Sequence, residues 1–203
     1  MQASKILFSA EEIGWAENSE FILTKNRIIK KIISLFALLS DEYREIADEK
    51  RKLLPEEFYL LSPKISRGEQ YLGLPYVILD YPRIFAKDNV FAIRTFFWWG
   101  NYFSLTLHLK GEYKDAFEEK IKKNLQLLSE NDYWIAVSDD EWRHDFEEEN
   151  YVPLKSGGVV VLNENLQQKA FLKLAVRWPL QNGNEIEPLY KEQFSTLLNV
   201  ITG

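Results

Sequence analysis

Arg94 is the residue of this chain whose setting most directly predicts binding chemistry. It lies in an aromatic segment, Val90–Lys110, whose side chains alternate as they do in strands. A guanidinium keeps its charge, so a buried Arg94 needs a carboxylate or a bound anion beside it. Asp80, in the preceding apolar segment, is the expected partner. The interpretations are a structural ion pair, an arginine that reaches solvent beside an edge strand, and an anion-binding site. The residues of that anion-binding site would be Arg94, Asp80, Tyr81 and Arg83.

Three aromatic residues in the same segment form a second group with a predicted binding role. Gly100-Asn101 predicts a two-residue hairpin turn, which would make Trp99 face Tyr102. This register places Phe97, Trp99 and Tyr102 on one face and Arg94 on the other, core-facing side. Monomers rarely leave so large an aromatic patch open. Its cover would be a helix of the same chain, a second copy of the chain, or a ligand.

No residue pattern in this chain predicts catalysis. The sequence lacks GxGxxG, GxxxxGK[ST], GxSxG and HExxH, the motifs of nucleotide binding, nucleophile activation and zinc chemistry. Ser104 and His108 share a predicted strand, but they lie about 13 Å apart by strand rise, too far for proton transfer. We therefore expect no catalytic residue and no cofactor, and we favour a non-enzymatic protein.

An acidic stretch, 139–149, contains the residue types that bind metals. On a helix, Asp140 or Glu141 would face the same way as His144 and Glu148 and offer oxygen and imidazole ligands. A capped, solvated helix with acids near its positive end explains the same residues. The second interpretation is preferred, so we expect no metal site.

Composition narrows the class of protein further. The 203 residues include 25 basic and 31 acidic side chains, and a net charge of −6 argues against nucleic-acid binding. Disulfides and thiolate sites are excluded because the chain has no cysteine. The early apolar run Ile6–Phe8 is too short for a signal peptide, and no run approaches the roughly 18 residues of a membrane helix. We expect a cytoplasmic protein with neither a nucleic-acid nor a membrane partner.

Two helices are expected at the start of the chain. Ser9 and Glu12 match a capping box, which predicts a short helix over 10–17. A longer helix should begin near residue 19 or 20, because apolar residues then recur at spacings of three and four. These residues are Ile29, Ile32, Phe36, Leu39, Tyr43 and Ile46. The apolar face is wide enough to favour packing on a sheet, and dimerisation through this helix is the alternative.

Strands dominate the rest of the chain. Pro82 is expected to close the first of them or to lie at a sheet edge, and the proline- and glycine-containing segment 62–75 should be a surface connection. The predicted strands are 76–81, the two halves of Val90–Lys110, 132–138, 159–162 and 170–178. The later predicted helices are 113–128, about 139–149 and about 188–201.

This order of elements predicts an α+β fold. We expect one domain over 1–203, with a helical part over about 9–60 and a sheet-containing part over about 71–203. Short connections between strands indicate a largely antiparallel sheet of five to six strands, with helices mainly on one face. The expected function is interaction or ligand binding, with a homodimer or another protein as partner. The alternative is a small-molecule enzyme or sensor that holds an anionic ligand near Arg94.

Overall fold

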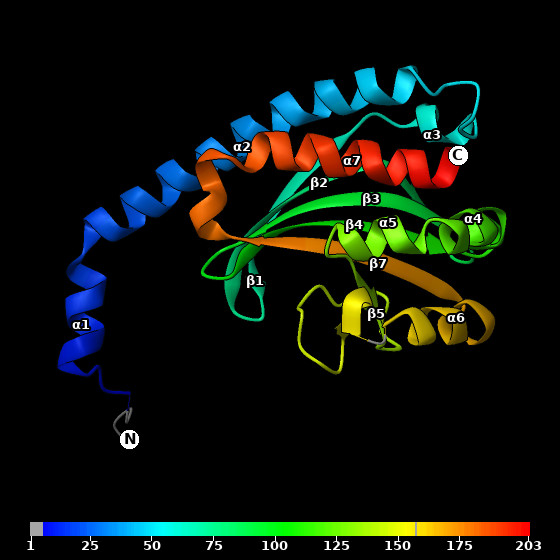
Figure 1. The fold of residues 1–203 in the computed structure, drawn as a ribbon. Helices are drawn as coiled ribbons and strands as arrows, with labels where there is room; N and C mark the ends of the chain where they lie inside the picture. Colours follow the sequence, from blue (N-terminus) through cyan, green and yellow to red (C-terminus); the bar gives the residue numbers. More distant parts are fainter. Residues whose placement is uncertain (1–5, 157) are drawn as a thin grey trace.

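The computed structural model describes residues 6–156 and 158–203 and has the predicted α+β class (Figure 1). Its strands are β1 (Lys64–Tyr71), β2 (Leu74–Phe85), β3 (Val90–Trp98), β4 (Tyr102–Lys110), β5 (Trp134–Ala136), β6 (Tyr151–Pro153) and β7 (Phe171–Pro179). Its α-helices are α1 (Ala10–Glu17), α2 (Ser19–Asp48), α3 (Glu57–Leu60), α4 (Glu112–Lys123), α5 (Leu125–Glu130), α6 (Gly158–Gln168) and α7 (Ile186–Thr202). Two short 3₁₀ helices, η1 (Leu154–Ser156) and η2 (Leu180–Asn184), complete the elements.

Within the described residues, seven strands form one antiparallel sheet in the order β1-β2-β3-β4-β7-β5-β6. The sheet is slightly larger than the five to six strands predicted, because β1 and β6 were not expected. The two longest helices, α2 and α7, run side by side across one face of the sheet, and the irregular segment 137–150 lies on the other side (Figure 1).

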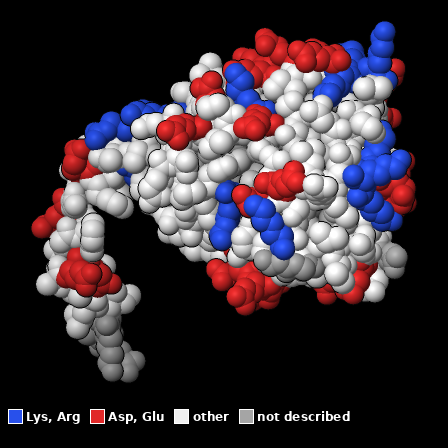
Figure 2. All heavy atoms as spheres, in the orientation of Figure 1, with Lys and Arg blue, Asp and Glu red and all other residues white. Residues whose placement is uncertain are grey.

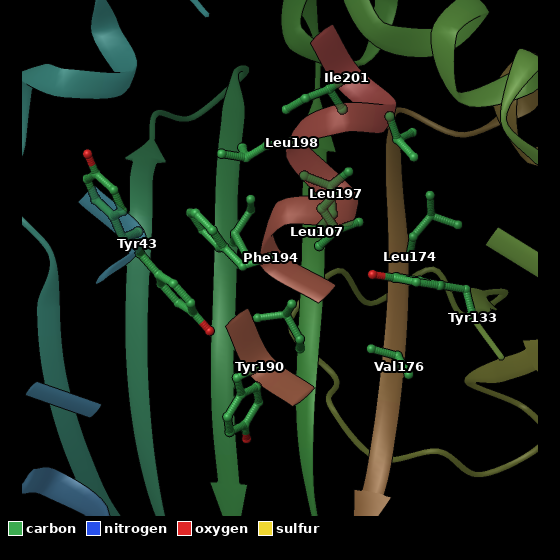
Figure 3. Close-up of a cluster of buried hydrophobic side chains, with 14 of the residues drawn as sticks. Tyr43, Leu107, Tyr133, Leu174, Val176, Tyr190, Phe194, Leu197, Leu198 and Ile201 are labelled. Carbon is green, nitrogen blue, oxygen red and sulfur yellow. The ribbon is translucent and has the colours of Figure 1, made fainter. Parts of the chain in front are cut away.

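The main core lies between this helical layer and the sheet. Tyr43 of α2 stacks on Phe194 of α7 with ring centroids 3.8 Å apart, and the Tyr190 hydroxyl donates to the Phe96 carbonyl at 2.9 Å. Figure 3 shows the α7 side chains directed toward the strands, among them Leu197. The predicted stripe of α2 is buried from Ile29 to Tyr43; at its end Ala47 is buried, whereas Ile46 is half-buried. The prediction that α2 packs on a sheet is confirmed.

The first part of the chain, residues 6–23, extends away from this body (Figure 1). It comprises α1 and the start of α2, and we call it the N-terminal arm. The predicted capping box is present, since Ser9 and Glu12 exchange both hydrogen bonds at the start of α1. Every residue of the arm is exposed. The arm therefore adds nothing to the core.

Segment 62–75 is not a surface connection, because most of it forms β1. Its glycines suggested a loop, but Gly68 lies in the strand opposite Tyr76. The Tyr76 ring covers the Gly68 α-carbon so closely that a β-carbon there would lie 2.5 Å from it. Gly73, with φ of +79°, makes the turn to β2.

Pro82 does not end its strand, since β2 continues to Phe85. Pairing with β1 ends at Asp80, so Pro82 has no partner strand on that side. Pairing with β3 becomes irregular between Asp80 and Arg83. The missing N–H of proline is tolerated because this stretch of β2 lies locally at an edge.

Two predicted elements have a different structure. The expected strand 159–162 begins α6, where Leu162 and Leu166 are buried at a spacing of four; the preceding Gly157 is outside the described residues. The expected helix 139–149 is irregular. The Ser138 hydroxyl accepts the Asp140 N–H at 3.1 Å, and the Asp140 carboxylate accepts the Trp142 N–H at 2.9 Å. These turn-forming bonds compete with helix. The helix predicted over 113–128 divides at Asn124 into α4 and α5.

The hairpin of β3 and β4 is shifted by one residue from the predicted register. Trp98, not Trp99, pairs with Tyr102, and the connection holds three residues, with Gly100 at φ of +73°. A one-residue shift exchanges the two faces of one strand relative to the other. Arg94 therefore pairs with Thr106 and lies on the side away from α7, not in the main core.

No helix in residues 6–156 or 158–203 has both the length and the apolar character needed to cross a bilayer.

Among the glycines that the structure describes, Gly111 is expected to be the least replaceable. Its φ is +59°, and an added β-carbon would lie 2.3 Å from the Asp88 carbonyl oxygen. Gly111→Ala should lower the free energy of unfolding by about 1–3 kcal/mol, measured by urea denaturation. Gly14→Ala is the matched control, because a β-carbon at that position of α1 meets nothing within 4 Å. Equal stability of the two variants would contradict the assigned backbone geometry.

Candidate functional site

The sheet face opposite α7 is partly covered by residues 137–150, which we call the strap. The Tyr71 hydroxyl accepts the N–H groups of His144 and Asp145 at 2.6 and 3.0 Å. Tyr102 donates to the His144 carbonyl at 3.1 Å, and the Lys173 ammonium donates to the Arg143 carbonyl. The strap is thus held to β1, β4 and β7 by side chains that reach its backbone.

Arg94 lies at the centre of this contact. Its Nε and Nη2 donate to the two Asp80 carboxylate oxygens at 2.7 and 2.9 Å. Its Nη1 lies 2.9 Å from Nε2 of His144 in the strap. A guanidinium can only donate, so this imidazole nitrogen is the unprotonated acceptor. Burial, with the charges of Lys173 and Arg94, lowers the pKa of His144 well below its usual value. A neutral His144 is consistent with both observations.

A second group of charges lies beside Arg94. Lys110 donates to Oε1 of Glu141 at 2.8 Å, and Nε2 of His108 lies 3.2 Å from Oε2 of the same carboxylate. Burial and the Lys173 charge lower the pKa of His108 to about 3. Lys173 itself is only 1% exposed. Burial and the Arg94 charge lower the pKa of Lys173 to about 7. These groups and the Arg94 group form what we call the polar centre.

The polar centre leaves almost no room for a ligand while the strap is in place. Its hollow has a volume of about 10 Å³, no more than a single water requires. Asp80 already occupies the bidentate position on Arg94 that an anionic ligand would take. The geometry is that of a structural centre which fixes the strap to the sheet. The residues lining the hollow are Phe85, Ala92, Arg94, Thr106, His108, His144 and Lys173.

The structure brings together only two of the four residues predicted to bind an anion. Asp80 and Arg94 form the expected ion pair. Tyr81 points to the helical side, where its ring lies 5.1 Å from that of Phe58, and burial raises its pKa to about 12. Arg83 donates instead to the Ser62 carbonyl at 2.6 Å. Tyr81 and Arg83 therefore do not share a site with Arg94.

The predicted aromatic patch is also divided between two places. Tyr102 packs against Phe146 of the strap, with ring centroids 5.2 Å apart. Phe97 and Trp99 lie on the helical side of the sheet and line a groove. Because of the one-residue register shift, Tyr102 does not belong to the surface that contains Phe97 and Trp99.

This groove has a volume of about 710 Å³. It lies between α2, the β3–β4 connection and η2, and most of its lining is apolar. Lys31 contributes the one charged side chain. The lining residues are Ile28, Lys31, Ile32, Leu35, Phe97, Trp99, Gly100, Phe103, Leu180, Gly183 and Asn184. We call it the α2 groove.

Sequence reasoning identified Phe97 and Trp99 but missed the other walls of the groove and most of the polar centre. The alternation of 170–178 placed Lys173 on the less apolar side of its strand, which was the available signal. Its burial comes from the strap, most of which the sequence predicts to be a helix. The groove walls contributed by α2 and η2 are far apart in the sequence and come together only in the folded chain, so the sequence alone could not predict them.

Among the described residues, no three histidine or acidic side chains are grouped so that they could hold a metal ion. In the strap, Asp140, His144 and Glu148 do not share a helix face, because the strap is irregular. Comparison with protein-family models, curated proteins and solved structures found no match.

Replacing Arg94 tests whether the polar centre is structural. Arg94→Met leaves the Asp80 carboxylate buried without its partner, so we expect a loss of about 3–5 kcal/mol in the free energy of unfolding. Combining Arg94→Met with Asp80→Leu should recover part of that loss, because no lone charge remains. Chemical denaturation in ligand-free buffer measures both. An Arg94→Met variant as stable as the wild type would favour an anion-binding role.

The pH dependence of stability tests the buried imidazole of His108. Its pKa is about 3 in the folded protein against 6.5 normally, so the unfolded chain binds more protons between these values. The free energy of unfolding should therefore fall as pH drops below about 6.5, by at most ~1.4 kcal/mol per pH unit for this group. The glutamine of His108→Gln cannot titrate. The free energy of unfolding of this variant, measured by urea denaturation at a series of pH values, should therefore fall less steeply below pH 6.5 than that of the wild type. An equal dependence on pH in the two proteins would show that the pKa of His108 is the same in the folded and unfolded chain.

Proposed function

We propose that this protein acts by binding a polypeptide partner in the α2 groove, and that a second copy of the chain is such a partner. The observation that carries the proposal is the groove itself, an apolar hollow of about 710 Å³ on the surface. Apolar concave surfaces of this size are typical binding sites. Because the groove lies beside a helix, it suits an apolar helical segment.

The lining supports protein binding rather than catalysis. Phe97, Trp99 and Phe103 form an aromatic wall, in which Trp99 is half-buried and the two phenylalanines are each 3% exposed. Aromatic residues are enriched at protein interfaces. Lys31 at the rim is the one titratable group among the lining residues. The buried groups with shifted pKa values, such as Lys173 and His108, lie on the opposite face of the sheet.

The anion-binding alternative has less support. It needs an Arg94 that is free to hold a ligand, but both Asp80 oxygens already accept from this guanidinium. The strap would also have to open, which breaks its bonds to Tyr71, Tyr102 and Lys173.

A charge placed in the groove tests the proposal. Leu35 lines the groove and is half-buried, so Leu35→Glu should weaken self-association more than tenfold, measured as molar mass by light scattering over a range of concentrations. Leu38→Glu is the matched control, because Leu38 is a 59% exposed residue of the same helix outside the groove. Circular dichroism would verify that both variants are folded. A wild type that stays monomeric at every concentration, or a dimer that Leu35→Glu leaves intact, would contradict binding through the groove.

A further inference from the structure

The N-terminal arm exposes more large apolar side chains than its size explains. Leu7 and Phe8 are 88% and 73% exposed, and Trp15 of α1 is 58% exposed. The series continues into α2 with Phe21, Ile22 and Leu23. Scattered apolar residues on a surface are ordinary, but a contiguous set of this size marks an interaction surface.

The arm ends close to the α2 groove along the same helix. Leu23 is the last residue of the arm, and Ile28, which lines the groove, follows five residues later on the same helix. At 1.5 Å per residue, the two lie about 7–8 Å apart along the helix axis. Figure 1 shows the arm leaving the body along α2, the helix that borders the groove.

The arm and the part of α2 that borders the groove carry opposite charges. Residues 6–20 contain four glutamates and no lysine or arginine, whereas residues 21–31 contain four basic residues and no acid. Figure 2 shows acidic side chains on α1 and basic side chains along the first half of α2. Lys31, at the groove rim, is exposed. An acidic arm is thus complementary to the border of the groove.

We propose that the N-terminal arm of one copy occupies the α2 groove of a second copy, and that the exchange is reciprocal. Because the arm and the groove adjoin, a two-fold axis between the copies places each arm in the other groove, which gives a closed dimer. The arm and the groove lining together supply about as many residues per copy as a stable interface needs, roughly 20–30. This inference rests on the function proposed above and names the segment that fills the groove.

Substitutions in the arm separate this inference from the proposed function. Because every arm residue is exposed, Ile13→Glu with Trp15→Glu should leave the folded body unchanged and weaken the dimer more than tenfold, as Leu35→Glu does. A dimer sensitive to Leu35→Glu but not to the arm variant would overturn the arm exchange and leave the groove proposal standing. A wild type that is always monomeric would overturn both.

Charge substitution supplies a second, independent readout. Glu11→Lys with Glu17→Lys cancels the net charge of residues 6–20, and Lys30→Glu with Lys31→Glu cancels that of residues 21–31. Each protein alone should associate more weakly than the wild type, because a neutral segment then meets a charged one at both arm–groove contacts. An equal mixture should form a heterodimer, since one of its two contacts again joins an acidic wild-type arm to a basic wild-type groove border. No recovery on mixing would contradict the exchange.

The absence of cysteine makes cross-linking specific. A chain carrying both Ile13→Cys and Leu35→Cys, treated with a short bis-maleimide, should give linked dimers on a denaturing gel. Ile13→Cys with Leu60→Cys is the matched control, because Leu60 is an exposed residue of α3 away from the groove. Closure within a single chain would show that the arm folds onto its own groove, and would overturn a second copy as the occupant.

Discussion

The pairing of Trp98 with Tyr102 is the constraint on which both surfaces of the sheet depend. Strand side chains alternate, so this one register decides that Phe103, Leu105 and Leu107 lie under the helical layer and that His108 lies with Arg94. A shift of one residue would bury the polar side chains of β4, such as His108, beneath α7. It would also turn Leu105 and Leu107 toward the strap. The main core, the polar centre and the α2 groove all follow from it.

The parts of this fold that could be predicted from the sequence are those with strong local signals. The Ser9 capping box and the apolar spacing of α2 identify both helices, and Asp80 could be assigned to Arg94 because neighbouring antiparallel strands place them opposite each other. The strap could not be predicted in this way. Ser138 and Asp140 begin helices and turns with the same hydrogen-bonding oxygens, and only the contacts with the sheet select the turn. The same segment buries Lys173, so the burial of Lys173 could not be predicted from the sequence either.

The polar centre shows how an irregular segment is held in one place. The strap offers no periodic apolar face to the sheet, and much of its attachment is directional: Tyr71 and Tyr102 bond its backbone, and Arg94 bonds His144. Burying such charges gives little net stability, but a bidentate ion pair permits only a narrow range of positions. Directional hydrogen bonds therefore position the strap as much as apolar contacts do. On the helical side of the sheet, by contrast, packing of large aromatic rings positions the helices.

The edges of the sheet have a consequence for how copies of this chain can associate. An open strand edge can pair with the same edge of another molecule and grow without limit into fibrils. Here β6 is only three residues long and ends at Pro153, which has no N–H, and β1 carries exposed Lys64 and Arg67 and an irregular register near its end. Both edges are poor templates for strand addition. The exposed apolar groups of the N-terminal arm therefore belong to a chain whose sheet edges oppose growth into amyloid-like polymers.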